Sequence, residues 1–133
     1  MKTTKPRVTG IGGIFFKAKS TKKLRSWYRK HLGLPLDPVW GGWAFHWRDA
    51  KKPARQGFTV WSAFDEGSDY FKPSKKSFMF NFRVKNLAKV LAELKKEGVW
   101  VDPEIIEDAN GRFCGILDCE GNRIELWEPA KGR

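Results

Sequence analysis

The chain presents one order of local signals twice, and this repeat restricts the folds open to it more than any other feature. In the first half, the strand-forming run Ile11–Ala18 is followed by a helix N-cap signal at Ser20 and by Gly33, which can end a helix at low cost. The second half repeats strand, cap and glycine at Phe78–Val84, Asn86 and Gly98. The caps are offset by 66 residues, from 20 to 86, which predicts two copies of one unit.

Each predicted helix carries an apolar stripe at a spacing of three and four residues. The stripes are Leu24, Trp27, Tyr28 and Leu32 in the first half, and Leu87, Val90, Leu91 and Leu94 in the second. Three strand candidates follow each helix: Leu36–Trp40, Trp43–Arg48 and Phe58–Phe64, then Val99–Ile106, Arg112–Leu117 and Arg123–Glu128. Each half is therefore predicted to be a βαβββ module of an α+β protein.

The chain length indicates a single domain built from both modules. With 133 residues it is the size of one ordinary domain, and a module of half that size is too small to bury a good core alone. We place the modules at about residues 8–64 and 78–129, joined by a polar linker over 65–77. The linker thus connects two parts of a single domain, which covers residues 1–133.

Charge and composition limit the classes of protein without choosing among them. The formal net charge of +11 suggests anionic partners, but the basic residues are spread along the chain and fit a solvated surface equally well. No run approaches the roughly 20 apolar residues of a membrane span. The opening segment MKTTKPRVTG lacks the apolar run of a secretory signal. Cys114 and Cys119 are expected to be free thiols in a reducing cytoplasm.

Alternation along the strands separates two faces of the predicted sheet. The more apolar series is expected to pack beneath the helices. Aligning Val60 with Ile124 places Trp61 on the opposite face, level with Glu125. That face then holds Phe15, Lys17, Trp61, Met79, Asn81, Arg83 and Glu125. An apolar lining with a few polar groups is typical of a ligand pocket, whereas the alternative is a half-exposed sheet face with ion pairs such as Arg83 with Glu125.

Nearly the whole chain, about residues 8 to 129, resembles the vicinal oxygen chelate superfamily, which includes glyoxalases, bleomycin-resistance proteins and extradiol dioxygenases. The segments that carry the resemblance are IGGIFFKAKSTKKLRSWYRKHLGLPL, FMFNFRVKNLAKVLAELKKEGV and GRFCGILDCEGNRIELWEP. The resemblance implies two tandem βαβββ modules that form a cupped, mixed, eight-stranded β-sheet with the helices outside. It also implies a ligand or a metal inside the cup.

The superfamily places metal ligands at four strand positions, which correspond here to Gly13, Trp61, Met79 and Glu125. Of these side chains, only that of Glu125 is a suitable ligand for a hard divalent cation. A catalytic divalent site generally has about three protein ligands. We therefore expect no metal and no other cofactor, with a divalent metal at Glu125 as the alternative. The missing ligands also argue against lactoylglutathione lyase activity.

His46 is the one candidate that could restore chemistry at this site. If the turn at Asp49 corresponds to that at Asp118, His46 faces the cup, where it could act beside Glu125 as a ligand or a general base. The alternative is an ordinary surface histidine. The assignment depends on the strand register, since a shift of one residue reverses every face.

The sequence thus predicts a glyoxalase-like, small-molecule-binding protein whose family metal site is largely lost. Phe15, Trp61 and Met79 would form an apolar wall, Lys17 and Arg83 would hold an anionic group, and Asn81 and Glu125 would orient the ligand. Whether the protein is an enzyme is left open. If it is, Glu125 and His46 are the candidate catalytic residues.

Two other functions stay open at this point. One is sequestration of an antibiotic or toxin, as in bleomycin-resistance proteins. The other is a ligand-sensing or nucleic-acid-associated basic domain, which only the charge supports. We expect a cytoplasmic homodimer without membrane contact, and a neutral or anionic organic ligand, since a net charge of +11 repels a cationic one.

Overall fold

The computed structural model describes residues 4–133, so the first three residues of MKTTKPRVTG, where no secretory signal was expected, lie outside it. Seven strands and two helices follow the predicted order and form one mixed sheet, which confirms the α+β class. The elements are β1 (Val8–Ala18), α1 (Thr21–Leu32), β2 (Trp43–Arg48), β3 (Gln56–Asp65), β4 (Phe78–Val84), α2 (Leu87–Lys96), β5 (Val101–Asp108), β6 (Gly111–Leu117) and β7 (Arg123–Pro129). Neither helix has the length and apolar character needed to cross a membrane.

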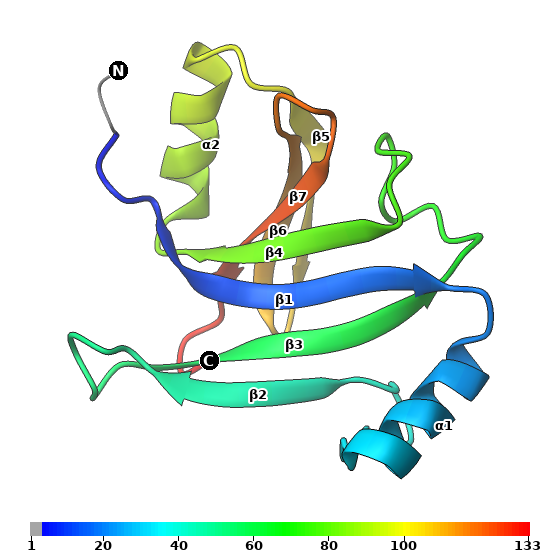
Figure 1. Ribbon diagram of the computed structural model, residues 1–133. Coiled ribbons are helices and arrows are strands. Elements are labelled where there is room, and N and C mark those ends of the chain that lie inside the picture. The colour runs from blue at the N-terminus through cyan, green and yellow to red at the C-terminus, as the bar shows by residue number, and fades with distance from the viewer. Residues whose placement is uncertain (1–3) are drawn as a thin grey trace.

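The two modules join edge to edge through their first strands. The strand order is β2-β3-β1-β4-β7-β6-β5, with β1 and β4 antiparallel at the centre. On either side of that pair, β3 lies parallel to β1 and β7 lies parallel to β4, so each module is built in the same way. Figure 1 shows β5, β6 and β7 running steeply to the direction of β1–β4, so the sheet is strongly turned.

Both helices begin and end where the sequence predicts. The Ser20 and Asn86 side chains accept hydrogen bonds from the backbone N–H groups of Lys23 and Lys89, at 3.2 and 3.1 Å. Gly33 is the C-cap of α1, and Gly98 directly follows Glu97, the C-cap of α2. The φ angles of the two glycines, 64° and 80°, lie in the left-handed region that glycine adopts at little cost. These local signals act within a few residues, which is why the sequence identifies them.

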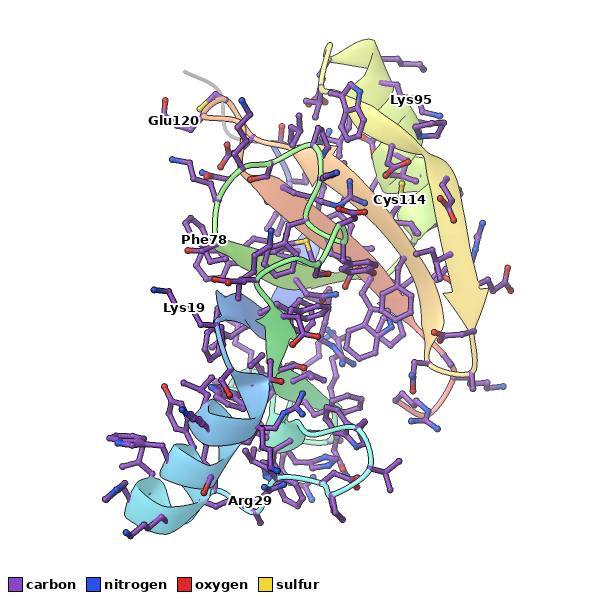
Figure 2. All side chains as sticks on the ribbon, turned by 90° about the vertical axis from the view of Figure 1, so that its right-hand side faces the viewer. Lys19, Arg29, Phe78, Lys95, Cys114 and Glu120 are labelled. Carbon is purple, nitrogen blue, oxygen red and sulfur yellow. The ribbon has the colours of Figure 1, made fainter. Side chains whose placement is uncertain are left out.

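The two helices differ in how much they bury. Leu87, Val90 and Leu91 of α2 are buried in a core with Leu126 of β7 and Cys114 of β6. Figure 2 labels Cys114 on these strands, at the end of the molecule that also carries Lys95 of α2. The helix α1 has no buried residue and lies at one corner of the sheet, beyond the end of β1 (Figure 1).

The predicted strand Leu36–Trp40 is wrong, and the sheet therefore has seven strands and not eight. Pro38 removes a backbone donor in the middle of this segment, and Pro35 stands directly before it. Asp37 instead accepts hydrogen bonds from the N–H groups of Val39 and Trp40, at 2.7 and 3.2 Å, in a local turn. The second module keeps the corresponding strand as β5.

The predicted face of Trp61 is also wrong. Ile14 of β1 is in register with Trp61 of β3, so both lie on the helix side, where Trp61 packs against Tyr28 of α1 at a ring distance of 4.8 Å. In the second module, the matching pair is Phe80 with Ile124. The true counterpart of Ile124 is therefore Trp61 and not Val60, a slip of one residue that moves every β3 side chain to the other face.

The helix side of the central strands is only partly covered. One row of side chains crosses five strands in register: Trp43, Trp61, Ile14, Phe80 and Ile124. Ile14 and Phe80, at the middle of this row, are 43% and 45% exposed. The expectation that the apolar series packs beneath the helices thus holds under α2 and fails at the centre of the sheet, because α1 lies at the corner.

The linker between the modules is more than a polar connection. Phe71 is fully buried, and its ring lies 5.1 Å from that of Phe64 at the end of β3. Arg123 of β7 donates a hydrogen bond to the carbonyl oxygen of Lys72 at 2.8 Å. The linker is therefore packed onto the cup side of the sheet.

The contrast between the helices predicts different costs for the two cap variants. Asn86→Ala should lower the free energy of unfolding by about 1 kcal/mol, because α2 is part of the core. Ser20→Ala should change it far less and should instead accelerate amide hydrogen exchange within α1, since that helix can fray without opening the core. Urea denaturation and hydrogen exchange would measure the two effects; equal losses of global stability would contradict this account.

Candidate functional site

The cup side of the sheet encloses a cavity of about 550 Å³ that both modules line. Its apolar wall consists of these side chains: Phe15, Trp40, Ala44, Phe58, Val60, Phe113 and Trp127. The side chains of Asn81 and His46 are polar groups on the same wall. A wider and more open hollow of about 730 Å³ lies beside it, and the two share His46, Phe58 and Arg133. The inner cavity is the better ligand site, because more of its wall is apolar and it is more enclosed.

A buried carboxylate lies behind this cavity. Glu125 is 5% exposed, and its oxygens accept hydrogen bonds from Nδ2 of Asn81, at 2.7 Å, and from the hydroxyl group of Tyr70. Burial raises the pKa of Glu125 above its usual range, although both hydrogen bonds oppose that shift. Burial and the nearby Glu125 charge also raise the pKa of Tyr70, so its phenol stays protonated and acts as a donor.

Asn81 connects the buried carboxylate to the cavity. Because its Nδ2 donates to Glu125, its Oδ1 must point the other way, and this oxygen is buried without a hydrogen-bond partner in the protein. Gly12 makes room for it, since a Cβ atom at residue 12 would collide with Oδ1 of Asn81 and with the ring of Trp127. A buried acceptor without a donor is unfavourable, so Oδ1 is the unsatisfied polar atom of this side chain.

Arg83 lies on the same face within a group of aromatic rings. Its guanidinium carbon is 4.7 Å from the ring centre of Trp127 and 5.5 Å from those of Phe58 and Trp47. It donates hydrogen bonds to the carbonyl oxygen of Phe58, at 3.5 Å, and to a main-chain oxygen of Arg133, at 2.6 Å. Burial lowers the pKa of Arg83. Among the described residues, no ion pair joins Arg83 to Glu125, so the expected pairing of these two is not formed.

The other predicted site residues are divided between different places. Phe15 and His46 line the cavity, as expected from the sequence. Met79 shares the cup side with Phe15 but is completely buried and does not line the cavity. Lys17 lies near the end of β1, with its Nζ atom 5.4 Å from the ring centre of Phe71, and is also absent from the cavity wall. Trp61 is on the opposite face, as described above.

His46 and Glu125 are not brought together. Three strands, β3, β1 and β4, separate β2 from β7 in the sheet. His46 is exposed at the cavity and lies against the ring of Phe58 at 5.4 Å, whereas Glu125 is enclosed by Tyr70 and Asn81. The expected proximity of the two candidate catalytic groups is therefore wrong, and each would have to act alone.

The donor set does not fit the metal of the resembled superfamily. With the corrected register, Ser62 takes the position assigned to Trp61, because Phe15 pairs with Ser62 as Asn81 pairs with Glu125. The set of Gly13, Ser62, Met79 and Glu125 still contains one carboxylate. The described residues hold no group of three or more His, Cys, Asp or Glu side chains close enough to bind a metal ion. Both oxygens of Glu125 already accept hydrogen bonds, so we derive no metal-dependent step.

Sequence reasoning missed Tyr70, which is the contact between the linker and the site. Its ring is stacked on that of Phe64 at 5.7 Å, and its hydroxyl group reaches Glu125. The two adjacent aromatic residues Tyr70 and Phe71 in a polar segment were the available signal. The sequence also did not identify three aromatic residues of the cavity wall: Phe58, Phe113 and Trp127. Their meeting depends on the curvature of the sheet, which determines the strands that face each other across the cup.

Comparison with solved structures shows the same fold in other proteins. Methylmalonyl-CoA epimerase from Mycobacterium tuberculosis is 23% identical, with a TM-score of 0.60 over 97% of this chain and 93% of that one. A Streptomyces coelicolor methylmalonyl-CoA epimerase in complex with 2-nitronate-propionyl-CoA is 17% identical, with a TM-score of 0.65 over 92% and 99%. A hypothetical protein from Bacillus halodurans is 16% identical, with a TM-score of 0.62 over 92% and 96%.

These matches support the fold that the sequence predicts and no particular activity. At identities of 16–23%, these matches show that the fold is shared. No family model matches the sequence, and neither does any curated protein. The likeness is therefore one of architecture, and function has to be argued from the site.

The raised pKa of Glu125 predicts a specific pH dependence of stability. Because its pKa is raised, the Glu125 carboxyl group holds its proton more tightly in the folded state than in the unfolded chain. The folded state therefore loses stability as the pH rises above the usual glutamate pKa of about 4.3. Glu125→Gln has no proton to release and should lack this loss. The difference in unfolding free energy, variant minus wild type, should therefore increase as the pH rises above the usual glutamate pKa, by up to about 1.4 kcal/mol per pH unit.

Urea denaturation of both proteins at several pH values measures this difference. Glu120→Gln, at an exposed position in the turn before β7, is the control for the change of residue type. A difference that stays constant or falls with pH would show that the buried carboxyl group is not held in the protonated form.

Proposed function

We propose that this protein is a glyoxalase-like binding protein that takes a small neutral or anionic organic molecule into the inner cavity. The observation that carries the proposal is the unpartnered Oδ1 atom of Asn81, a residue that lines a cavity whose wall is mostly apolar. A ligand N–H or O–H group there would remove an unfavourable buried acceptor, while the aromatic wall would cover its apolar body. The volume of about 550 Å³ suits an organic molecule of drug size.

The charges near the cavity support a neutral or anionic ligand over a cationic one. Arg83 does not line the cavity but contacts the rings of Phe58 and Trp127, which do, and Lys131 and Arg133 line the adjoining hollow. A structural neighbour in complex with a CoA derivative, an anionic small molecule, is in keeping with this class of ligand. A cationic ligand would be repelled by these groups and by the net charge of +11.

We propose binding and no metal-dependent reaction, because the donor set does not fit the metal and Glu125 is enclosed. This makes sequestration of a neutral or anionic toxin a function that the same cavity could serve. His46, exposed at the mouth, is the polar group that a bound molecule would meet first. We further propose that the protein works in the cytoplasm, since Cys114 and Cys119 are both free thiols.

The binding proposal is tested with two adjacent residues on opposite faces of β3. Val60→Trp should fill the cavity and weaken the binding of 2-naphthoate and 2-naphthamide at least tenfold. Trp61→Phe, on the helix side, should leave both affinities within about twofold. Titration followed by NMR would measure them, with spectra of both variants establishing that they are folded. Equal affinities for the Val60→Trp variant and the wild type would place the ligand elsewhere.

We also propose that the uncovered row on the helix side joins two copies of the chain. The row contains no charged side chain, and for a protein with a net charge of +11 an uncharged face is the one that can meet its own copy without repulsion. Its central residues, Ile14 and Phe80, are apolar and nearly half exposed, as the core of an interface should be before assembly.

Sedimentation equilibrium tests this assembly. The wild-type chain of 15.4 kDa should sediment as a dimer, and Ile14→Glu should sediment as a monomer, because a charge at the centre of the interface loses its water. Lys51→Glu, in the exposed β2–β3 turn, alters the charge by a larger amount and should leave the dimer intact. A monomeric wild type at high protein concentration would refute the proposal.

A further inference from the structure

Most of the excess positive charge of the chain lies in its first module. Residues 8–64 contain eleven Lys and Arg against two Asp, a net charge of +9, whereas residues 78–129 contain seven Lys and Arg against ten Asp and Glu, a net charge of −3. The two modules occupy opposite halves of the sheet, as β2-β3-β1 and β4-β7-β6-β5. One half of the molecule is therefore basic and the other weakly acidic. Such an asymmetry is typical of a protein whose partner is an anionic polymer or surface.

The helix α1 concentrates this charge. It has no acidic residue and carries five cations: Lys22, Lys23, Arg25, Arg29 and Lys30. Among the described residues, none of the five forms an ion pair. In α2, by contrast, Glu93 forms an ion pair with Arg7 at 3.4 Å. Figure 2 labels Lys19 and Arg29 towards opposite ends of α1, at the end of the molecule away from Lys95 of α2. The cations of α1 are thus free to meet an external anion.

A groove of about 590 Å³ lies between α1 and the end of β1, and we call it the α1 groove. Within the described part of the chain, its wall has no acidic side chain and combines three lysines with three aromatic rings: Lys17, Lys19, Lys23, Phe16, Trp27 and Tyr28. Asp65 contacts α1 through Thr21, at 3.3 Å, but does not line the groove. Phe16 follows Ile14 by two residues and so lies on the helix side of the sheet. The α1 groove is therefore separate from the ligand cavity on the cup side.

Trp27 is the most exposed ring of this wall, at 52%. It is supported from behind by a series of ring contacts: Trp27 to Tyr28 at 5.3 Å, Tyr28 to Trp61 at 4.8 Å, and Trp61 to Phe16 at 5.3 Å. Lys23 and Lys30 lie four residues before and three after Trp27, so all three share one face of the helix, with the lysines about 10 Å apart along its axis. A supported, exposed ring with a cation on either side can stack a base while the lysines contact phosphates.

We propose that the α1 groove binds single-stranded nucleic acid, with a base stacked on Trp27 and the phosphates held by Lys19, Lys23 and Lys30. A single strand fits better than a duplex, because paired bases present no free face to an exposed ring. It fits better than a lipid membrane, because the rings line a concave surface, which a flat bilayer does not fill. This activity is additional to ligand binding in the cup and does not depend on it.

Two exposed tryptophans test the stacking. Trp27→Ala should weaken the binding of labelled oligouridylate and oligothymidylate, each about twelve nucleotides long, at least about fivefold in fluorescence anisotropy. Trp27→Phe keeps a ring and should stay within about threefold of the wild type. Trp100→Ala removes a tryptophan of the second module that is 42% exposed, and should change neither affinity. The tighter binder of the two oligonucleotides identifies the partner as RNA or as DNA.

Two pairs of charge reversals separate the placement of charge from its amount. The double variants Lys23→Glu, Lys30→Glu in α1 and Lys89→Glu, Lys96→Glu in α2 change the net charge equally and at the same spacing. The α1 pair should weaken binding at least about tenfold, and the α2 pair at most about threefold. Three phosphate contacts also predict that the wild type loses about twentyfold in affinity between about 50 and 200 mM salt. Circular dichroism spectra of all variants establish that they are folded.

Three outcomes would overturn the proposal. Equal weakening by the two pairs of charge reversals would show that binding follows net charge and has no site. Unchanged affinity of Trp27→Ala would show that no base stacks on this ring. Binding to phosphatidylserine vesicles that requires Trp27, together with oligonucleotide binding that does not, would assign the α1 groove to a membrane surface. The ligand cavity enters none of these measurements, so its failure and the failure of this proposal are distinguishable.

Discussion

The antiparallel pairing of β1 with β4 is the constraint on which the rest of the structure depends. It joins the two modules, neither of which could bury a sufficient core alone. It also brings Gly12 against Asn81 and Trp127, where any side chain at residue 12 would collide with both. Asn81 can therefore lie at the centre of the cup because β1, the first strand of one module, has a glycine where it meets β4, the first strand of the other. The parallel partners β3 and β7 then carry Val60 and Glu125 to either side of this centre.

The carboxylate of Glu125 explains why the linker is part of the fold. A buried carboxyl group is unfavourable unless hydrogen-bond donors surround it, and here they come from Asn81 and from Tyr70 of the linker. Phe71 and the hydrogen bond from Arg123 to Lys72 hold the linker in that position. A position that carries a metal ligand in the resembled superfamily thus carries a hydrogen-bonded carboxyl group here, which stabilises the connection between the modules.

From the sequence, the net charge of +11 could indicate either an anionic partner or an ordinary solvated surface, and the structure distinguishes the two for individual residues. Most basic side chains lie on exposed turns and helix surfaces, where they are solvated. Arg83 differs, because it is buried among aromatic rings with main-chain oxygens as its acceptors. Lys17, which the sequence places on the same face, lies at Phe71 instead. Arg83 is thus an enclosed positive charge beside Phe58 and Trp127, two residues that line the cavity.

The sequence by itself determined the features that depend on neighbours within a few residues: the caps at Ser20 and Asn86, the glycines that end the helices, and the alternation along each strand. It also identified Asn81, Glu125 and His46 as residues of the cup side. Tertiary structure decided the register of β3, which replaces Trp61 by Ser62, and the entry of Tyr70 into the site. It also decided the meeting of Phe58 with Trp127 and the contact of Arg83 with Arg133. These features depend on which distant segments pair and on how the sheet curves, and no local pattern in the sequence contains that information.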